Sequence, residues 1–160
     1  MFNNLPLHAL IVHMPIALTV LVPLFAVLAL VLGRRIMTPT LAWSFPIGLL
    51  ALLLVSGLIA EQTGEQQEDK VERFVPEAAF EKHEEAAELF LFITGGVLVL
   101  SAGGLLRNRV GATMRLVGTA GTLVVFGAGW NVGHSGGALV YEHNAGAAYS
   151  QSTTVAEPER

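Results

Sequence analysis

The sequence contains no cysteine, little charge and few aromatic residues, and each shortage excludes a class of protein. Without cysteine the chain cannot form a disulfide, attach a c-type haem covalently, ligate an iron–sulfur cluster through thiolates or use a thiol nucleophile. Only 14% of the residues are charged, whereas 52% are hydrophobic. No dense basic patch exists, so a nucleic-acid partner is not expected. This balance is typical of a small polytopic membrane protein.

Positive charge is also missing from the N-terminal end, where a secretory signal places it ahead of its apolar core. The first basic residue is Arg34, which follows the first apolar run. We therefore expect this run to be a retained membrane helix. A chain of 160 residues has the size of one domain.

Four apolar runs approach the roughly 20 residues that a helix needs to cross a bilayer. They are Met14–Leu32, Leu41–Ala60, Ala86–Leu106 and Leu116–Val132. The fourth is the weakest because four glycines dilute it, at positions 118, 121, 127 and 129. Glycines at such spacing suit close packing against a neighbouring helix, which we favour, or against a flat ligand. The sequence thus predicts an all-α, four-helix transmembrane bundle over residues 1–146, followed by a disordered polar tail over residues 147–160.

The distribution of charge predicts how this bundle is oriented. The segments Gly33–Thr40 and Arg107–Arg115 contain arginine and no acidic residue, so both should be cytoplasmic. Both termini then lie on the periplasmic side. Every Asp and Glu falls on that side as well, either within Glu61–Glu88 or after Val132. The loop Glu61–Phe80 is acidic, and Pro76 favours a helix start that continues into the third span.

The same topology places all five histidines on the periplasmic side, although they lie far apart in the sequence. His13 opens the first span, where an ionisable group is costly and usually functional when it faces inward. The alternative is an interfacial histidine that only forms a hydrogen bond. On one helix His8 would point about 140° away from His13. We therefore expect His8 to reach the same site only if the backbone before it is extended.

Two further segments supply the other histidines. His83 is followed by Glu84 and Glu85, and carboxylates often orient a ligand histidine, although a solvated polar collar has the same composition. Within Gly133–His143, three glycines predict a loop that brings His143 back towards His134. A loose surface loop is the alternative there. Ser135 lacks an acidic orienting group for its histidine neighbour, so no nucleophilic triad is predicted.

Several of these segments resemble one bacterial family. They are His8–Leu18, Ser56–Ala60, His83-Glu84 and Gly133–Tyr141. The family consists of predicted four-span inner-membrane proteins whose transmembrane domain has no known function. Its members often occur with Rieske iron–sulfur or c-type cytochrome modules, which implies redox work at the outer membrane face. The resemblance carries over His8, His13, His83 and His134, whereas the segment containing His143 departs from the usual glycine-rich pattern.

The leading functional hypothesis is a b-type haem protein that passes electrons between quinol or a membrane partner and a periplasmic acceptor. The expected cofactor-binding residues are His13, His83, His134, Gly136 and Gly137. Four glycines of the third and fourth spans would make room for the macrocycle, at positions 95, 96, 127 and 129. The propionates would find few cations on this side, only Lys70, Arg73 and Lys82.

Two alternatives remain open. The first is a module that binds a copper, iron or zinc ion through imidazoles, with His8, His13, His83, His134 and His143 as candidate ligands. The second is a structural accessory subunit of a redox complex. Each alternative describes an electron-transfer, binding or anchoring protein rather than a stand-alone enzyme. The expected environment is the bacterial inner membrane, with a separate redox partner and a homodimer through the glycine-lined fourth helix.

Overall fold

The computed structural model describes residues 7–150, and every regular element among them is helical. The helices are α1 (Leu7–Ile11), α2 (His13–Ile36), α3 (Pro39–Glu65), α4 (Glu68–Val71), α5 (Glu77–Ala102), the 3-10 helix η1 (Gly103–Leu105), α6 (Arg109–Tyr141) and α7 (Ala147–Ser150). The predicted all-α class is therefore confirmed.

Four helical segments are long and apolar enough to cross a membrane, which agrees with the four predicted spans. They are Leu7–Gly33, Pro39–Glu65, Glu77–Leu105 and Arg109–Tyr141. Each is longer than the apolar run that predicted it. At 1.5 Å per residue, the 33 residues of α6 extend about 50 Å, compared with about 30 Å of hydrocarbon. α6 is therefore longer than the hydrocarbon core that it would cross.

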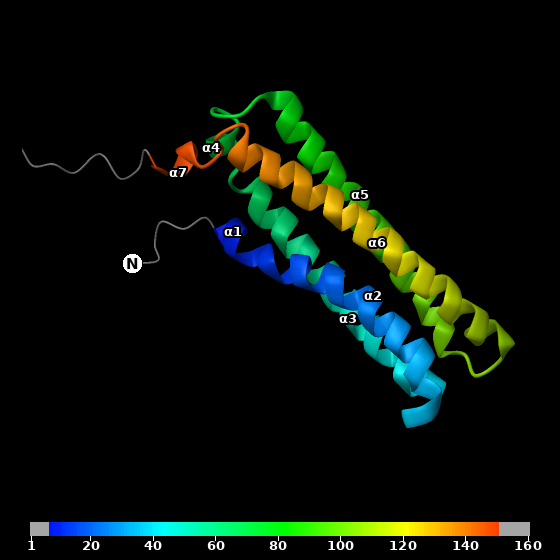
Figure 1. Cartoon of the computed structure of the whole chain (residues 1–160). Coiled ribbons are helices and arrows are strands. Elements are labelled where there is room, and N and C mark those ends of the chain that lie inside the picture. The colour runs from blue at the N-terminus through cyan, green and yellow to red at the C-terminus, as the bar shows by residue number, and fades with distance from the viewer. Residues whose placement is uncertain (1–6, 151–160) are drawn as a thin grey trace, which may run out of the picture.

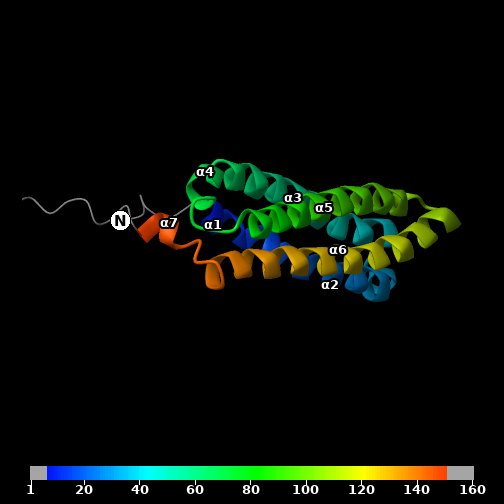
Figure 2. The same ribbon diagram turned by 90° about the horizontal axis from the view of Figure 1, so that it is seen from above.

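The four long helices form a square bundle in which neighbours along the chain are antiparallel neighbours in space. Figure 1 shows α2 beside α3 and α5 beside α6, and Figure 2, turned by 90°, shows α3 with α5 and α2 with α6. The two arginine-bearing turns meet at one end, which we call the arginine end. The opposite end, formed by α1, α4, α7 and the helix ends beside them, we call the histidine end.

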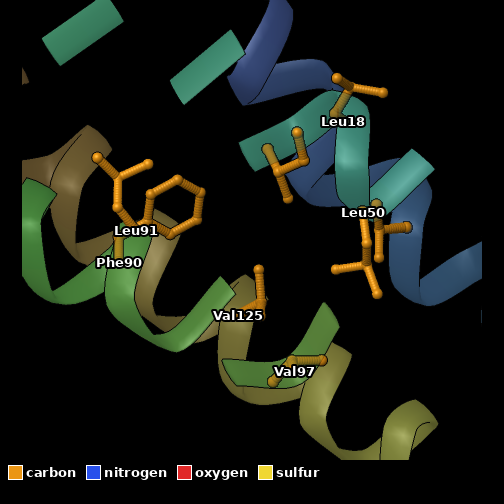
Figure 3. Close-up of a cluster of buried hydrophobic side chains, with 8 residues drawn as sticks. Leu18, Leu50, Phe90, Leu91, Val97 and Val125 are labelled. Carbon is orange, nitrogen blue, oxygen red and sulfur yellow. The ribbon is translucent and has the colours of Figure 1, made fainter. Parts of the chain in front are cut away.

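The bundle is closed in its middle by apolar side chains from all four long helices, shown in Figure 3. They are Leu18, Val22, Leu50, Leu53, Phe90, Leu91, Val97 and Val125. Buried hydroxyls in the same interior bond back to their own helices, as Thr94 does to Phe90 O at 2.7 Å. Large apolar side chains such as Phe92 and Val99 are exposed instead on the outside. A chain that exposes this much apolar surface around its circumference is suited to lipid.

Side-chain caps set the helix starts at the arginine end. Thr38 Oγ1 accepts a hydrogen bond from Leu41 N, and Pro39 occupies the first turn of α3. Asn108 Oδ1 accepts one from Gly111 N at 3.0 Å at the start of α6. A side chain at Gly111 would collide with the backbone of Leu106, so glycine permits this tight turn.

The predicted glycine loop over Gly133–His143 is wrong, because α6 continues as a helix to Tyr141. Glycine destabilises a helix by about 1 kcal/mol relative to alanine, but packing offsets this. Leu139 is buried with Val75 and Ala145 in a second small core. The chain turns only at Asn144, whose φ of 57° is left-handed, and Ala145 N then bonds to Leu139 O at 2.9 Å.

The segment between the second and third spans contains more helix than the sequence suggested. α3 continues to Glu65, α4 follows, and α5 begins at Glu77 directly after Pro76, where a helix start was predicted. The first four residues of the predicted tail form α7. The remaining tail residues, 151–160, lie outside the described part of the chain.

Candidate functional site

His8 contacts α3 near the periphery of the histidine end. Its Nδ1 lies 2.8 Å from the carbonyl oxygen of Ala60, so Nδ1–H donates the hydrogen bond. The ring also lies against Gly64, where an added Cβ would be 3.3 Å from Cε1 of His8. The hydrogen bond uses Nδ1, so Nε2 is the ring nitrogen that could bind a ligand.

His83 is held in a similar way by α6. Its Nδ1 lies 2.9 Å from Ser135 Oγ, and that hydroxyl donates its own hydrogen to Val132 O at 3.0 Å. Because a hydroxyl has one hydrogen, we assign the proton of the first bond to Nδ1 of His83. An added Cβ at Gly136 would lie 3.0 Å from Cε1 of the same ring. Ser135 and Gly136 thus orient the His83 ring, and its Nε2 is the nitrogen that could bind a ligand.

The two imidazoles lie close enough for their charges to interact, although they come from α1 and α5. They also lie at similar heights in the bundle. α3 advances about 26 Å from Trp43 to Ala60, and α5 about 27 Å from Ser101 to His83. Trp43 donates a hydrogen bond to Ser101 O at the arginine end, so both lengths are measured from the same level of the bundle. Both rings therefore lie about one hydrocarbon thickness away from that level.

Acidic side chains lie on the two helices that carry Ala60 and His83. Glu61 follows Ala60 on α3, and its charge interacts with those of Glu65, Glu84 and Glu88. Glu84 follows His83 on α5. These carboxylates make this end of α3 and α5 negatively charged, which favours cations near it.

The other predicted ligands do not join the pair. His13 is exposed, and its Nδ1 has only a long contact of 3.3 Å to Leu10 O. His134 is exposed because its neighbour Ser135 points inward, and consecutive helical residues diverge by about 100°. His143 is half-buried beyond the end of α6. Within residues 7–150, no group of three or more His, Asp or Glu side chains is arranged to hold a metal ion.

His8 lies in the helix Leu7–Ile11, so its backbone is not extended, and it does not share a site with His13. It reaches α3 instead, because α3 continues past the apolar run to Glu65. His8 faces α3, whereas His13 points away from the bundle.

The glycines that were expected to make room for a macrocycle fall into two groups. Gly129 packs closely against Thr19 and Phe90, as the helix-packing interpretation requires. Gly118 and Gly121 likewise meet side chains of neighbouring helices. The others have no neighbouring atom within 4 Å of an added Cβ, namely Gly95, Gly96, Gly127 and Gly137. A side chain at these positions would meet open space.

Sequence reasoning missed the residues that hold the two histidines. Ser135 was considered only as a nucleophile, and Gly64 was not considered. One signal was available for Gly64. Small residues recur at helical spacing along α3, at Ser56, Gly57, Ala60 and Gly64, and such a stripe favours close approach of a neighbouring helix.

Comparison with known proteins identifies a family for this chain. No curated protein and no solved structure matches the chain. The sequence does match the family described as "Predicted membrane protein (DUF2231)" over residues 4–149, which is nearly its whole length. The structure supplies the four membrane-length helices that such a description requires. The chain therefore belongs to this family of predicted membrane proteins.

Proposed function

We propose that the protein binds a b-type haem at the histidine end and transfers electrons at the outer face of the bacterial inner membrane. The observation that carries the proposal is the His8–His83 pair. Each ring uses Nδ1 in a hydrogen bond to another helix, and each keeps Nε2 for a ligand. Metal-binding histidines in proteins are commonly oriented in this way.

The orientation follows from the distribution of charge. Arg35 lies at the end of α2, and Arg107, Arg109 and Arg115 lie near the start of α6, all at the arginine end. Basic turns of this kind remain in the cytoplasm. The histidine end then faces the periplasm, and the proposed redox partner would act there.

The donor set fits a haem at the edge of the bundle rather than in its middle. Two imidazole nitrogens match an axial ligand pair for haem iron, and a bound haem would supply one-electron transfer. His8 and His83 would hold the iron, and Gly64 and Gly136 let the two rings pack directly against α3 and α6. The middle of the bundle is filled by side chains such as Leu53 and Val125, which are fully buried.

A single metal ion is the second candidate, and the nearby carboxylates favour it. Glu61 interacts electrostatically with Glu65, Glu84 and Glu88 at the same end of α3 and α5. Imidazole and carboxylate together suit copper, iron or zinc. Such a protein would handle or sense the ion rather than carry electrons. The accessory-subunit hypothesis remains if neither ligand binds.

One set of measurements on the detergent-purified full chain tests these proposals. Haem predicts a Soret band and a split reduced spectrum after reconstitution, whereas a metal site predicts a colourless or weakly coloured protein with stoichiometric metal by elemental analysis. His8→Ala and His83→Ala should each reduce ligand content by at least about tenfold. His13→Ala and His134→Ala are matched controls that should retain it, because their rings point away from the pair.

Two results would contradict the proposal. The controls could lose as much ligand as His8→Ala and His83→Ala, which would show that the pair is not the ligand set. All four variants could also insert into the membrane and behave identically, with no haem or metal in the parent protein. That second result would leave the accessory role.

A further inference from the structure

A second feature of the histidine end is a hollow between α4 and α7. Its volume is about 310 Å³, and it is lined by Asp69, Lys70, Arg73, Phe74 and Ala148. Two independent tethers hold its walls together. The Tyr149 hydroxyl donates a hydrogen bond to Gln67 Oε1, which joins α7 to the start of α4. The small core of Val75, Leu139 and Ala145 fixes the segments on either side.

The hollow gathers positive charge at an end of the molecule that is otherwise acidic. Only three basic residues are described there, and two of them, Lys70 and Arg73, line the hollow. Neither forms an ion pair within residues 7–150, despite the many carboxylates nearby. Like charges three residues apart repel each other, so their convergence without a counter-ion is unfavourable. Asp69, also in the lining, offsets part of this charge.

The remaining lining is apolar. Phe74 and Ala148 supply an aromatic and a methyl surface beside the two cations. An oxyanion attached to an apolar group would satisfy both parts of the hollow. A guanidinium and an ammonium both bind carboxylates and phosphates through charge-assisted hydrogen bonds.

We propose that the α4–α7 hollow binds a small amphiphilic oxyanion, a carboxylate or phosphate that carries an aryl or alkyl group. Lys70 and Arg73 contact the oxyanion, and Phe74 contacts the apolar group. The site is separate from the His8–His83 pair and does not depend on a haem or metal being bound there. The proposal therefore goes beyond the proposed function and can fail independently of it.

Phenyl phosphate is a suitable probe, with inorganic phosphate as the control for its anionic part and benzyl alcohol as the control for its aryl part. Binding to the full chain in detergent at low ionic strength can be followed by calorimetry and by ligand-detected NMR. Phenyl phosphate should bind more tightly than either control, and raising the salt should weaken it. The double variant Lys70→Gln/Arg73→Gln should weaken binding by at least about tenfold, because two charge-assisted contacts are lost.

Two further variants keep the test specific. Lys82→Gln removes one positive charge from the same end but outside the hollow, so binding should change by less than about twofold. Phe74→Ala should weaken the binding of phenyl phosphate and leave the binding of inorganic phosphate unchanged. The proposal is overturned if Lys82→Gln weakens binding as much as the double variant, if benzyl alcohol binds as well as phenyl phosphate, or if phenyl phosphate does not bind. Benzoate in place of phenyl phosphate distinguishes a carboxylate from a phosphate site.

Discussion

The two ends of the bundle use their polar groups in opposite ways. At the arginine end, the Trp43 indole donates a hydrogen bond to Ser101 O at 2.8 Å, and the Arg115 guanidinium donates one to Gly104 O at 2.6 Å. A side chain at Gly104 would collide with Trp43. At the histidine end, His8 and His83 each use one ring nitrogen and keep the other.

This difference separates the part of the molecule that holds the fold from the part that is available for binding. The arginine end packs a fully buried tryptophan between helices, so its main polar groups serve folding. Among residues 7–150, the histidine end leaves imidazole nitrogens, carboxylates and two cations without ion-pair or hydrogen-bond partners. Polar groups without a partner in the folded chain are expected at functional sites, because residues there are selected for binding rather than for the stability of the fold.

The largest effect in this comparison should come from Trp43→Ala. Trp43 is 1% exposed and Trp130 is 71% exposed, so the second residue is a matched control. Removing a buried aromatic side chain typically costs about 3–5 kcal/mol, whereas Trp130→Ala removes only a peripheral contact. Thermal unfolding in detergent should show a large drop in midpoint for Trp43→Ala and a small one for Trp130→Ala. Equal drops would mean that the arginine end does not hold the fold.

An intermediate effect should separate two adjacent glycines at the histidine end. A Cβ at Gly136 would lie 3.0 Å from Cε1 of His83, whereas one at Gly137 would meet no atom within 4 Å. Gly136→Ala should displace the ring and weaken ligand binding by about tenfold, the equivalent of about 1.4 kcal/mol. Gly137→Ala should bind as the parent does. Titration of both variants with haem and with the metal ion measures the difference, and equal affinities would show that His83 does not need its present position.

The fold was largely predictable because its signals are averages over many residues. Hydropathy over about 20 positions located all four spans, and the distribution of charge predicted that both arginine turns share one end. The end of α6 was not predictable in this way. Glycine propensity favoured a loop after Gly133, but Leu139 packs against Val75 in the folded chain, and contacts of that kind are not local in sequence.

The candidate site was predictable only in part, because residue type does not say which way a side chain points. His8 and His83 were both singled out, and the two rings lie within range of each other's charge. His13 and His134 were singled out on similar grounds, and they point away. The decisive residues are Ala60, Gly64 and Ser135, which carry no obvious chemistry of their own. They orient imidazoles from other helices, so their role appears only after the helices are packed.

The smallest predicted effect concerns the tether between α7 and α4. Burial raises the pKa of Tyr149 above its usual value of 10.0, and the protonated phenol donates to Gln67 Oε1. The folded state therefore favours the neutral form. This contribution to stability is present below pH 10 and is lost as the pH rises through the raised pKa of the folded state. In a Tyr141→Phe background, which leaves Tyr149 as the single tyrosine, phenolate absorbance should appear at higher pH in the native protein than in the unfolded protein. Identical titrations in the two states would show that α7 is not docked on α4 as the structure has it.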